Sequence, residues 1–293
     1  MSEKRRQHER KIILLLAAAC LVVWLAAAAL LAAENREVEA PDAAVRTTLS
    51  VKTIRITDGD ESFSMQKDKT TWECTSAGAP LNSTEVSVLA SSFGDLTADR
   101  IIPDGREYFG QFGLDAPAFQ IAAGGDAGEK VWNVGDYNPI LGQYYVTVDE
   151  DDTIYLVPKN QMEKCMKTLL DLVMTPGLES MKSSDILQYE VIEGEESFLS
   201  ETAENIFFAL KNTAYDHCLT YEAGENDLKK YDLDQPDLEI RMTMADNTVL
   251  KVKIAEAGDG TAYLNAWDNS IVYQMAEDDL ANLKEKIAAE KEA

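Results

Sequence analysis

The chain has few residues of the kinds that build common catalytic centres, with two histidines and four cysteines among 293 residues. Only His217 lies beyond residue 33, which excludes multi-histidine zinc sites and argues against histidine-based triads. Its neighbour Cys218 should point to the opposite face of a strand, so adjacency argues against a Cys-His nucleophile. Cys74 and Cys165 lack CxxC or metal-ligand spacing, and we expect thiols rather than a redox centre.

Positive charge is also scarce outside the N-terminus. The part after residue 33 carries 22 basic and 50 acidic side chains, a net charge of −28. A phosphate backbone needs a basic surface to dock on, so this balance excludes ordinary nucleic-acid binding, and it disfavours adsorption onto anionic lipid. The glycines of AAGGDAGEK have no following Lys-Ser/Thr and therefore predict a hairpin loop rather than a phosphate loop.

The one long apolar run is Ile12 to Ala33, which has no charged residue. As a helix its 22 residues would rise about 33 Å, the thickness of a bilayer's hydrocarbon core. The basic tail 1–11 predicts a cytoplasmic N-terminus and a single-pass anchor with the rest of the chain outside the cell membrane. Cleavage after Ala33 and lipidation of Cys20 remain alternatives.

Beyond an acidic, Ala-rich linker at 34–50 the pattern changes to short alternating runs. Val51 to Met65 predicts a hairpin turning at Asp58-Gly59, and Trp72 lies in a further strand. Asn82 predicts the N-cap of a helix, and strands at intervals of about ten residues predict an antiparallel meander. A helix over 160–173, capped by Asn160, should close this first module, which we assign to 51–175.

The second half repeats this order. EGEESF at 193–198 matches DGDESF at 58–63 with an offset of 135, whereas YDLDQP at 231–236 matches FGLDAP at 112–117 with an offset of 119. The smaller offset indicates that the second copy, assigned to 184–288 before a tail at 289–293, lacks the Trp72 strand and its neighbouring loop. The sequence therefore predicts an α+β protein: an N-terminal transmembrane helix, then two tandem-duplicated modules of mostly antiparallel sheet with packed helices.

The repeated hexapeptide is the clearest internal motif. We expect Leu114 and Leu233 to anchor a turn and Gly113 to have positive φ, which Asp232 tolerates. The aspartates should accept backbone hydrogen bonds, and the prolines should start an edge strand. The residues of this structural repeat motif are Phe112, Gly113, Leu114, Asp115, Pro117, Tyr231, Leu233, Asp234 and Pro236.

The chain resembles the bacterial domain of unknown function family 4340 in five features. They are an apolar span, an alternating hairpin, a tryptophan strand, the aromatic-Gly-Leu-Asp-x-Pro step and GQYYV at 142–146. The likeness extends over nearly all of the outer part and is stronger in the first copy. It implies a membrane-anchored protein found beside components of ABC-type export or gliding-motility systems, without an established activity.

No residue is assigned a catalytic, cofactor-binding or metal-binding role. The run Asp149 to Asp152 lacks the alternate spacing and glycine turn of a calcium loop, so it predicts a solvated hairpin tip. We expect a non-enzymatic accessory or interaction protein of an ABC-type transport system, held by 12–33 and bound to a protein partner. The alternatives are an extracellular ligand-binding module with its site between the two lobes and a carboxylate-based cell-envelope hydrolase.

Overall fold

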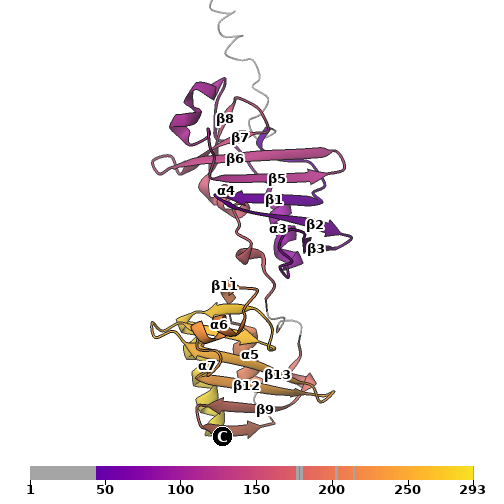
Figure 1. Ribbon diagram of the computed structural model, residues 1–293, viewed down its shortest axis with the longest axis vertical. Coiled ribbons are helices and arrows are strands. Elements are labelled where there is room, and N and C mark those ends of the chain that lie inside the picture. The colour runs from indigo at the N-terminus through magenta and orange to yellow at the C-terminus, as the bar shows by residue number, and fades with distance from the viewer. Residues whose placement is uncertain (1–43, 176–177, 179–180, 202–203, 214, 293) are drawn as a thin grey trace, which may run out of the picture.

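The computed structural model describes residues 44–292 except 176–177, 179–180, 202–203 and 214. It is an α+β structure with two antiparallel sheets, one in each half of the chain (Figure 1). This confirms the predicted fold class at that level. The predicted span 12–33 lies outside the described residues, and within them no helix is long and apolar enough to cross a membrane.

The first sheet has eight strands in the order β3-β2-β1-β5-β6-β7-β8-β4. All neighbouring pairs are antiparallel, and the run from β5 to β8 is the predicted meander. The strands are β1 Thr53–Asp58, β2 Glu61–Asp68, β3 Thr71–Cys74, β4 Arg100–Ile102, β5 Phe119–Gly125, β6 Gly128–Asn138, β7 Gln143–Val148 and β8 Ile154–Pro158.

The alternating sequence explains the first hairpin. Ile54 pairs with Met65 and Ile56 with Phe63, and all four side chains are buried on one face of the sheet. Gly59 has φ +57° in the connecting turn, a conformation that glycine adopts without a steric penalty. The predicted hairpin is therefore confirmed, although Asp58 pairs with Glu61 and the turn is Gly59-Asp60 rather than Asp58-Gly59. Strand β3 carries the buried Trp72 beside it.

Two α-helices cover this face. In α3 Ser83–Ser92 the Asn82 side chain accepts hydrogen bonds from the amides of Thr84 and Glu85, which confirms the predicted cap. The predicted helix over 160–173 is wrong in length and cap: α4 Lys159–Cys165 starts after Pro158 and is followed only by the 3-10 turn η2 Leu170–Leu172. The helix ends because Met166 has ψ of 80°, outside the helical region.

The second sheet has seven strands in the order β10-β9-β12-β13-β14-β15-β11. They are β9 Ile186–Glu193, β10 Glu196–Ser200, β11 Tyr215–Thr220, β12 Leu238–Met244, β13 Val249–Glu256, β14 Ala262–Ala266 and β15 Val272–Met275. Its helices are α5 Glu204–Lys211, α6 Glu225–Lys230 and α7 Glu277–Lys291, and the 3-10 turn η4 Ser183–Asp185 precedes β9.

Aligned by position, the two strand orders are the same except that, among the described residues, the second sheet has no counterpart of β3. Hairpin β9–β10 corresponds to β1–β2, and its Gly194 has φ +58°, close to the value at Gly59. This topology supports a duplicated module, with the missing strand where the difference in offset placed it. The drop in motif offset from 135 to 119 therefore marked the place where the two sheets differ by one strand.

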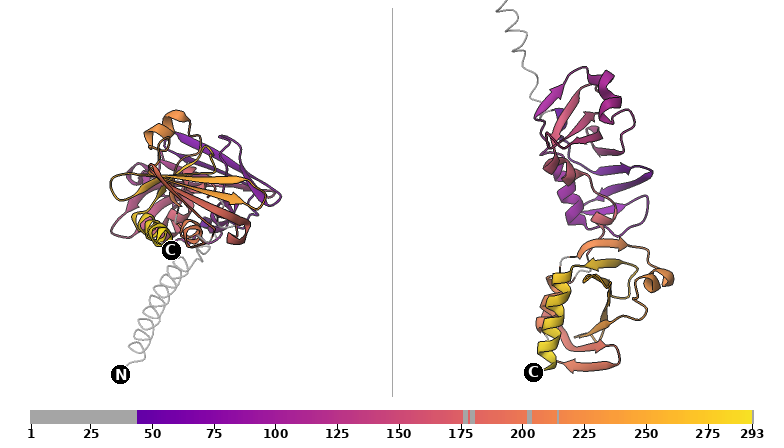
Figure 2. Two further views of the ribbon diagram at one scale, coloured as in Figure 1. Left: turned by 90° about the horizontal axis from the view of Figure 1, so that it is seen from below. Right: turned by 90° about the vertical axis from the view of Figure 1, so that its left-hand side faces the viewer.

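Each sheet has two differently covered faces (Figure 2). Helices α3 and α4 bury Val86, Leu89 and Met162 against the first sheet, and α5 and α7 pack together on the same side of the second. The opposite faces carry η1 Gly105–Phe112 in the first module and α6 in the second, each over a small separate apolar cluster.

The segment after α4 joins the two modules. Leu172 packs in the first core, whereas its neighbour Val173 packs with the core of the second sheet. The Tyr273 hydroxyl of β15 donates to the Met174 carbonyl oxygen.

At the N-terminal end of the described chain, residues 44–50 of the expected linker lie against the first sheet. There the Trp132 indole N–H donates to the carbonyl of the buried Val45.

Candidate functional site

The repeated hexapeptide forms the same backbone turn in both modules. The Leu114 amide donates to the Phe109 carbonyl at 2.8 Å, and the Leu233 amide donates to the Leu228 carbonyl at 2.8 Å. The residue before each leucine is left-handed, with φ +70° at Gly113 and φ +54° at Asp232. The two turns therefore have one geometry, and the predicted positive φ is present at both positions.

The leucines of this turn are buried beneath η1 and α6. Leu114 packs with Phe109 and Ile154, and the fully buried Leu233 packs with Ala255 and Val272. An aromatic pair closes each cluster: Phe112 stacks on Tyr145 with ring centroids 4.0 Å apart, and Tyr231 meets Tyr263 at 4.8 Å. These contacts indicate that the motif has a structural role in both copies.

Two details of the predicted motif are wrong. Neither Asp115 nor Asp234 accepts a hydrogen bond from any described residue, so these carboxylates do not stabilise the turn. Pro117 and Pro236 each lie two residues before β5 and β12, and those strands are internal rather than edge strands. The prolines still avoid the loss of a ladder hydrogen bond, because they precede the paired residues.

A cavity of about 510 Å³ lies between η1 and the first sheet. Side-chain hydrogen bonds cross its floor. The Gln120 side-chain NH₂ group donates to the Asn133 side-chain oxygen at 2.6 Å, and the Asn133 side-chain NH₂ group donates to the Thr147 hydroxyl at 3.2 Å. Asp115 and the acidic tip at 149–151 form part of its wall. Among the described cavities this one brings the most carboxylates together, so the hydrolase alternative would have its groups here.

The aspartates of the acidic tip form hydrogen bonds and an ion pair within the first module. Asp149 has φ +54° and accepts from the Val131 amide, while Asp151 accepts from the Thr153 amide and the Tyr155 hydroxyl. Asp152 forms an ion pair with Arg106 at 3.0 Å. In the described part of the chain, no group of three or more His, Cys, Asp or Glu residues is arranged to hold a metal ion.

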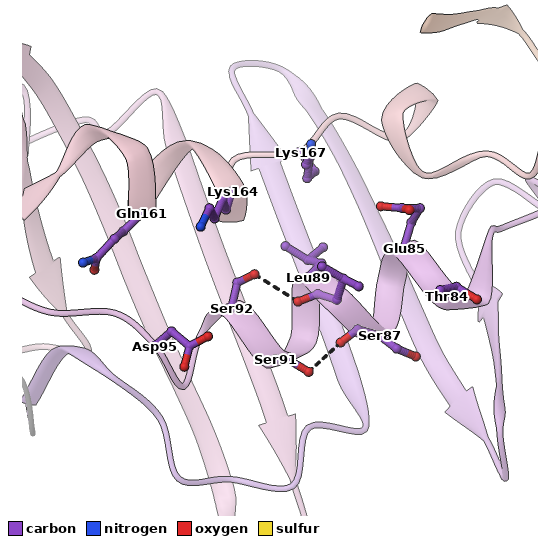
Figure 3. Close-up of a pocket in the computed structure, with 11 residues that line it drawn as sticks. Thr84, Glu85, Ser87, Leu89, Ser91, Ser92, Asp95, Gln161, Lys164 and Lys167 are labelled. Carbon is purple, nitrogen blue, oxygen red and sulfur yellow. Dashed lines mark hydrogen bonds between the residues drawn. The ribbon is translucent and has the colours of Figure 1, made fainter. Parts of the chain in front are cut away.

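A larger open groove of about 600 Å³ runs between α3 and α4 (Figure 3). On the α3 side the hydroxyls of Ser87, Ser91 and Ser92 each donate to the carbonyl four residues earlier, so they are tied to their own helix. Val88 is 56% exposed between them. The side opposite α3 is formed by Gln161, Lys164 and Lys167.

The charge of this groove differs from that of the chain as a whole. No carboxylate among the described residues lies within ion-pair distance of Lys164 or Lys167, although Glu85 and Asp95 line other parts of the groove. Sequence reasoning missed this site. Its signal was the Ser83, Ser87, Ser91 spacing, which places small polar residues on one helical face.

The cysteines and the outer histidine are dispersed. Cys74, Cys165 and Cys218 are all free, and His217 is exposed on β11 while Cys218 faces the core. Burial raises the pKa of Cys165 to about 12 and that of Cys218 to about 11. For Cys74, partial burial opposes ionisation, but hydrogen bonds from the Ala77 and Ser76 backbone and the Ser76 hydroxyl lower its pKa overall.

Comparison with known proteins gives one family. Residues 72–206 match the model of the family described as "Domain of unknown function (DUF4340)". The match begins in β3 and ends in α5, so it contains both cavities described above and is narrower than the resemblance predicted from the sequence. No curated protein and no solved structure matches the chain.

We predict that Leu114→Ala and Leu233→Ala each lower the free energy of unfolding by about 3 kcal/mol, because each removes a buried side chain from a small cluster. Urea denaturation followed by circular dichroism measures this. The control Leu199→Ala removes a side chain that is 62% exposed and should cost less than about 0.5 kcal/mol. Equal effects at all three positions would contradict the structural role of the turn.

Exchanging the left-handed residues Gly113 and Asp232 between the two turns should change the free energy of unfolding by different amounts. Gly113→Asp is expected to lower the free energy of unfolding by about 2 kcal/mol, because a Cβ there would lie 2.7 Å from the Asp136 carboxylate. Asp232→Gly should change it by less than about 0.5 kcal/mol, since relief of the left-handed conformation offsets the added chain entropy. The same denaturation experiment tests both variants, and a symmetric result would refute this account.

We predict that Cys74 reacts with a thiol reagent faster than Cys165 and Cys218 do. In a Cys20→Ser background at pH 8, Ellman's reagent should modify Cys74 first, because its pKa is lowered and it is partly exposed. Cys165 and Cys218 should react only on denaturation, since their raised pKa values keep them protonated and the fold covers them. A fast phase that survives Cys74→Ser would disprove this assignment.

Proposed function

We propose that this chain, whose residues 72–206 match the model of the DUF4340 family, is a membrane-anchored extracytoplasmic accessory protein that binds a subunit of an ABC-type transport system. In this proposal the chain contributes binding and no chemistry of its own. The association with a transporter derives from the family resemblance, and the binding site derives from the geometry of the first module.

The observation that carries the proposal is the α3–α4 groove. It is open to solvent, has the exposed Val88 in its lining, and is bounded by small hydroxyl side chains that are already hydrogen-bonded. A partner segment placed here would bury Val88 without stripping water from unsatisfied donors. The groove lies beside α4, which ends at Cys165, whereas its counterpart α7 is 15 residues long and packs along α5.

The distribution of charge around this groove favours one orientation of a bound partner. The part of the chain after residue 33 has a net charge of −28, so an acidic partner surface is repelled by most of the molecule. Lys164 and Lys167 form no ion pair among the described residues and can therefore meet carboxylates of that partner, whereas Glu85 and Asp95 lie elsewhere in the groove. Two lysines on one side of the groove favour one docking orientation of such a partner.

Anchoring would hold the groove near a membrane-embedded transporter. The apolar run 12–33 and the basic residues before it support a single-pass anchor with a cytoplasmic N-terminus. A tethered module meets its partner at a high effective concentration, so modest affinity is sufficient. This is the usual physical advantage of an accessory subunit confined to the same membrane as its partner.

The test is binding of the full chain, in detergent, to a purified ABC-type permease complex encoded beside it. We expect wild-type binding, and we expect Lys164→Glu/Lys167→Glu to weaken it by about tenfold or more, mainly through a slower association rate. Biolayer interferometry at low and high salt measures both quantities. The salt dependence should be smaller in the double variant, since the exposed attraction is removed.

The matched control reverses two exposed lysines of α6 in the second module, Lys229→Glu/Lys230→Glu. It makes the same change in net charge, so it should leave affinity within about twofold if the groove is the site. No binding by the wild-type chain would refute the proposed function. Equal losses in both double variants would show that net charge rather than the groove governs binding.

A further inference from the structure

The loop between β6 and β7 carries the most exposed large apolar side chain among the described residues. Ile140 is 92% exposed at the tip of this loop, Leu141 beside it is 39% exposed, and Tyr137 at its base is 37% exposed. Single exposed apolar residues are normal on protein surfaces, but here two adjacent loop residues are exposed close to an exposed tyrosine at the end of β6. We call Pro139–Leu141 the apolar tip.

Hydrogen bonds hold the apolar tip in one conformation. The Asn138 side-chain oxygen accepts from the amides of Ile140 at 3.0 Å and Leu141 at 3.1 Å, while its NH₂ group donates to the Tyr145 hydroxyl at 2.8 Å. The Gly142 amide donates to the Asn138 carbonyl, and Gly142 has φ +67°. The exposed side chains are therefore presented on a preorganised loop, which reduces the entropy lost on binding.

The second module shows that the fold does not require an apolar tip. Its equivalent loop joins β13 to β14 through Ala257, Gly258, Asp259, Gly260 and Thr261. There the Asp259 carboxylate accepts from the Thr261 amide at 2.9 Å, and the Ala257 amide donates to the Thr261 carbonyl at 2.9 Å. A polar turn thus closes the same hairpin, so the isoleucine and leucine of the first module have no role in closure.

Helix α4 connects the apolar tip to the α3–α4 groove. The Lys159 amide donates to the Gly142 carbonyl at 3.0 Å, and the Lys159 ammonium lies 5.3 Å from the centre of the Tyr137 ring. Gln161, two residues further on, and Lys164, five residues further on, line the groove. The apolar tip lies at the start of α4 and the groove lies further along it, so one partner can contact both. Lys159 forms an ion pair with Glu163 at 3.5 Å, which leaves Lys164 as the lysine of α4 without an ion pair among the described residues.

We propose that the apolar tip inserts into an apolar pocket on the permease complex, and that carboxylates beside that pocket face Lys164 and Lys167. This inference rests on the proposed function and adds to it the chemistry of the partner surface. The acidic exterior of the chain makes α4 the favourable place for those carboxylates. Burial of Ile140 supplies affinity, while the lysines fix orientation.

A protein pocket fits the arrangement better than a lipid surface. The chain leading from the predicted anchor meets the first sheet where the Lys130 ammonium donates to the Ala44 and Arg46 carbonyls. Lys130 is near the start of β6, whereas the tip follows its end at Asn138, about 26 Å away along an extended strand. The acidic exterior also opposes close approach to anionic headgroups.

The binding test uses the full chain in detergent and the purified permease complex as the probe. Ile140→Ser/Leu141→Ser should weaken binding by about 10- to 100-fold, because two apolar side chains lose their pocket. Leu199→Ser is the matched control, since Leu199 is 62% exposed on β10 of the second module, and it should change affinity by less than about twofold. Unchanged thermal unfolding of both variants shows that they are folded.

The results separate the two proposals. If the wild-type chain binds and the tip variant binds equally well, the tip inference is overturned while the proposed function stands. If the wild-type chain does not bind, the proposed function fails and the tip inference fails with it. Weakening by the tip variant but not by Leu199→Ser supports both.

A fluorescent label decides between protein and lipid. The full chain with Ile140→Cys, Cys20→Ser and Cys74→Ser, labelled with nitrobenzoxadiazole, is reconstituted into vesicles of phosphatidylethanolamine and phosphatidylglycerol. We expect the emission of an exposed label in vesicles alone and a blue shift when the permease complex is incorporated. A full blue shift without the permease would assign the tip to lipid and overturn the proposed protein pocket.

Discussion

The hydrogen bond from a leucine amide to the carbonyl five residues earlier decides the architecture of each module. It closes η1 at Leu114 and α6 at Leu233, and the left-handed residue before each leucine turns the chain back over its sheet. The chain then enters an internal strand, β5 or β12, which pairs on both sides. Because side chains alternate between the two faces of a strand, a turn displaced by one residue would exchange the core and solvent faces of that strand. The two copies differ in the residue that permits the turn, glycine or aspartate, but the buried leucine is common to both.

The duplicated frame carries different surfaces. On the face beneath η1 the first module has an uncharged ladder of Gln120, Asn133 and Thr147, whereas the second module has Lys251 and Lys253 paired with Asp268 at 3.2 Å. On the helical face the groove lies beside the 7-residue α4, whereas the 15-residue α7 packs along α5 in the second module. The hairpin tips differ in the same sense, apolar in one module and polar in the other. Since both copies share one topology, these differences are not required for folding, and the features that point to binding gather in the first module.

Local signals were sufficient for much of the fold. The Asn82 cap, the alternation of Ile54, Ile56, Phe63 and Met65, and the glycine turn at Gly59 each depend on residues close in sequence, and the structure contains all three. Predictions that depended on partners distant in sequence were less accurate. Helical spacing continued through Val173, yet the helix ends at Cys165, and Leu172 and Val173 pack in two different cores. The prolines suggested edge strands, although β5 and β12 have neighbours on both sides, and strand order is not encoded near the proline.

The sequence by itself determined the class of the protein: an acidic α+β chain with a duplicated motif, few groups suited to catalysis, and a DUF4340 relationship that the family match confirms for residues 72–206. These properties follow from composition and from short-range patterns, which need no knowledge of distant contacts. Only the tertiary structure decided that Val88, Lys164 and Lys167 share a groove and that Ile140 projects from a rigid loop beside α4. Exposure and proximity of this kind depend on where each helix stops and on what fails to cover it, and those outcomes are set by packing across the whole module.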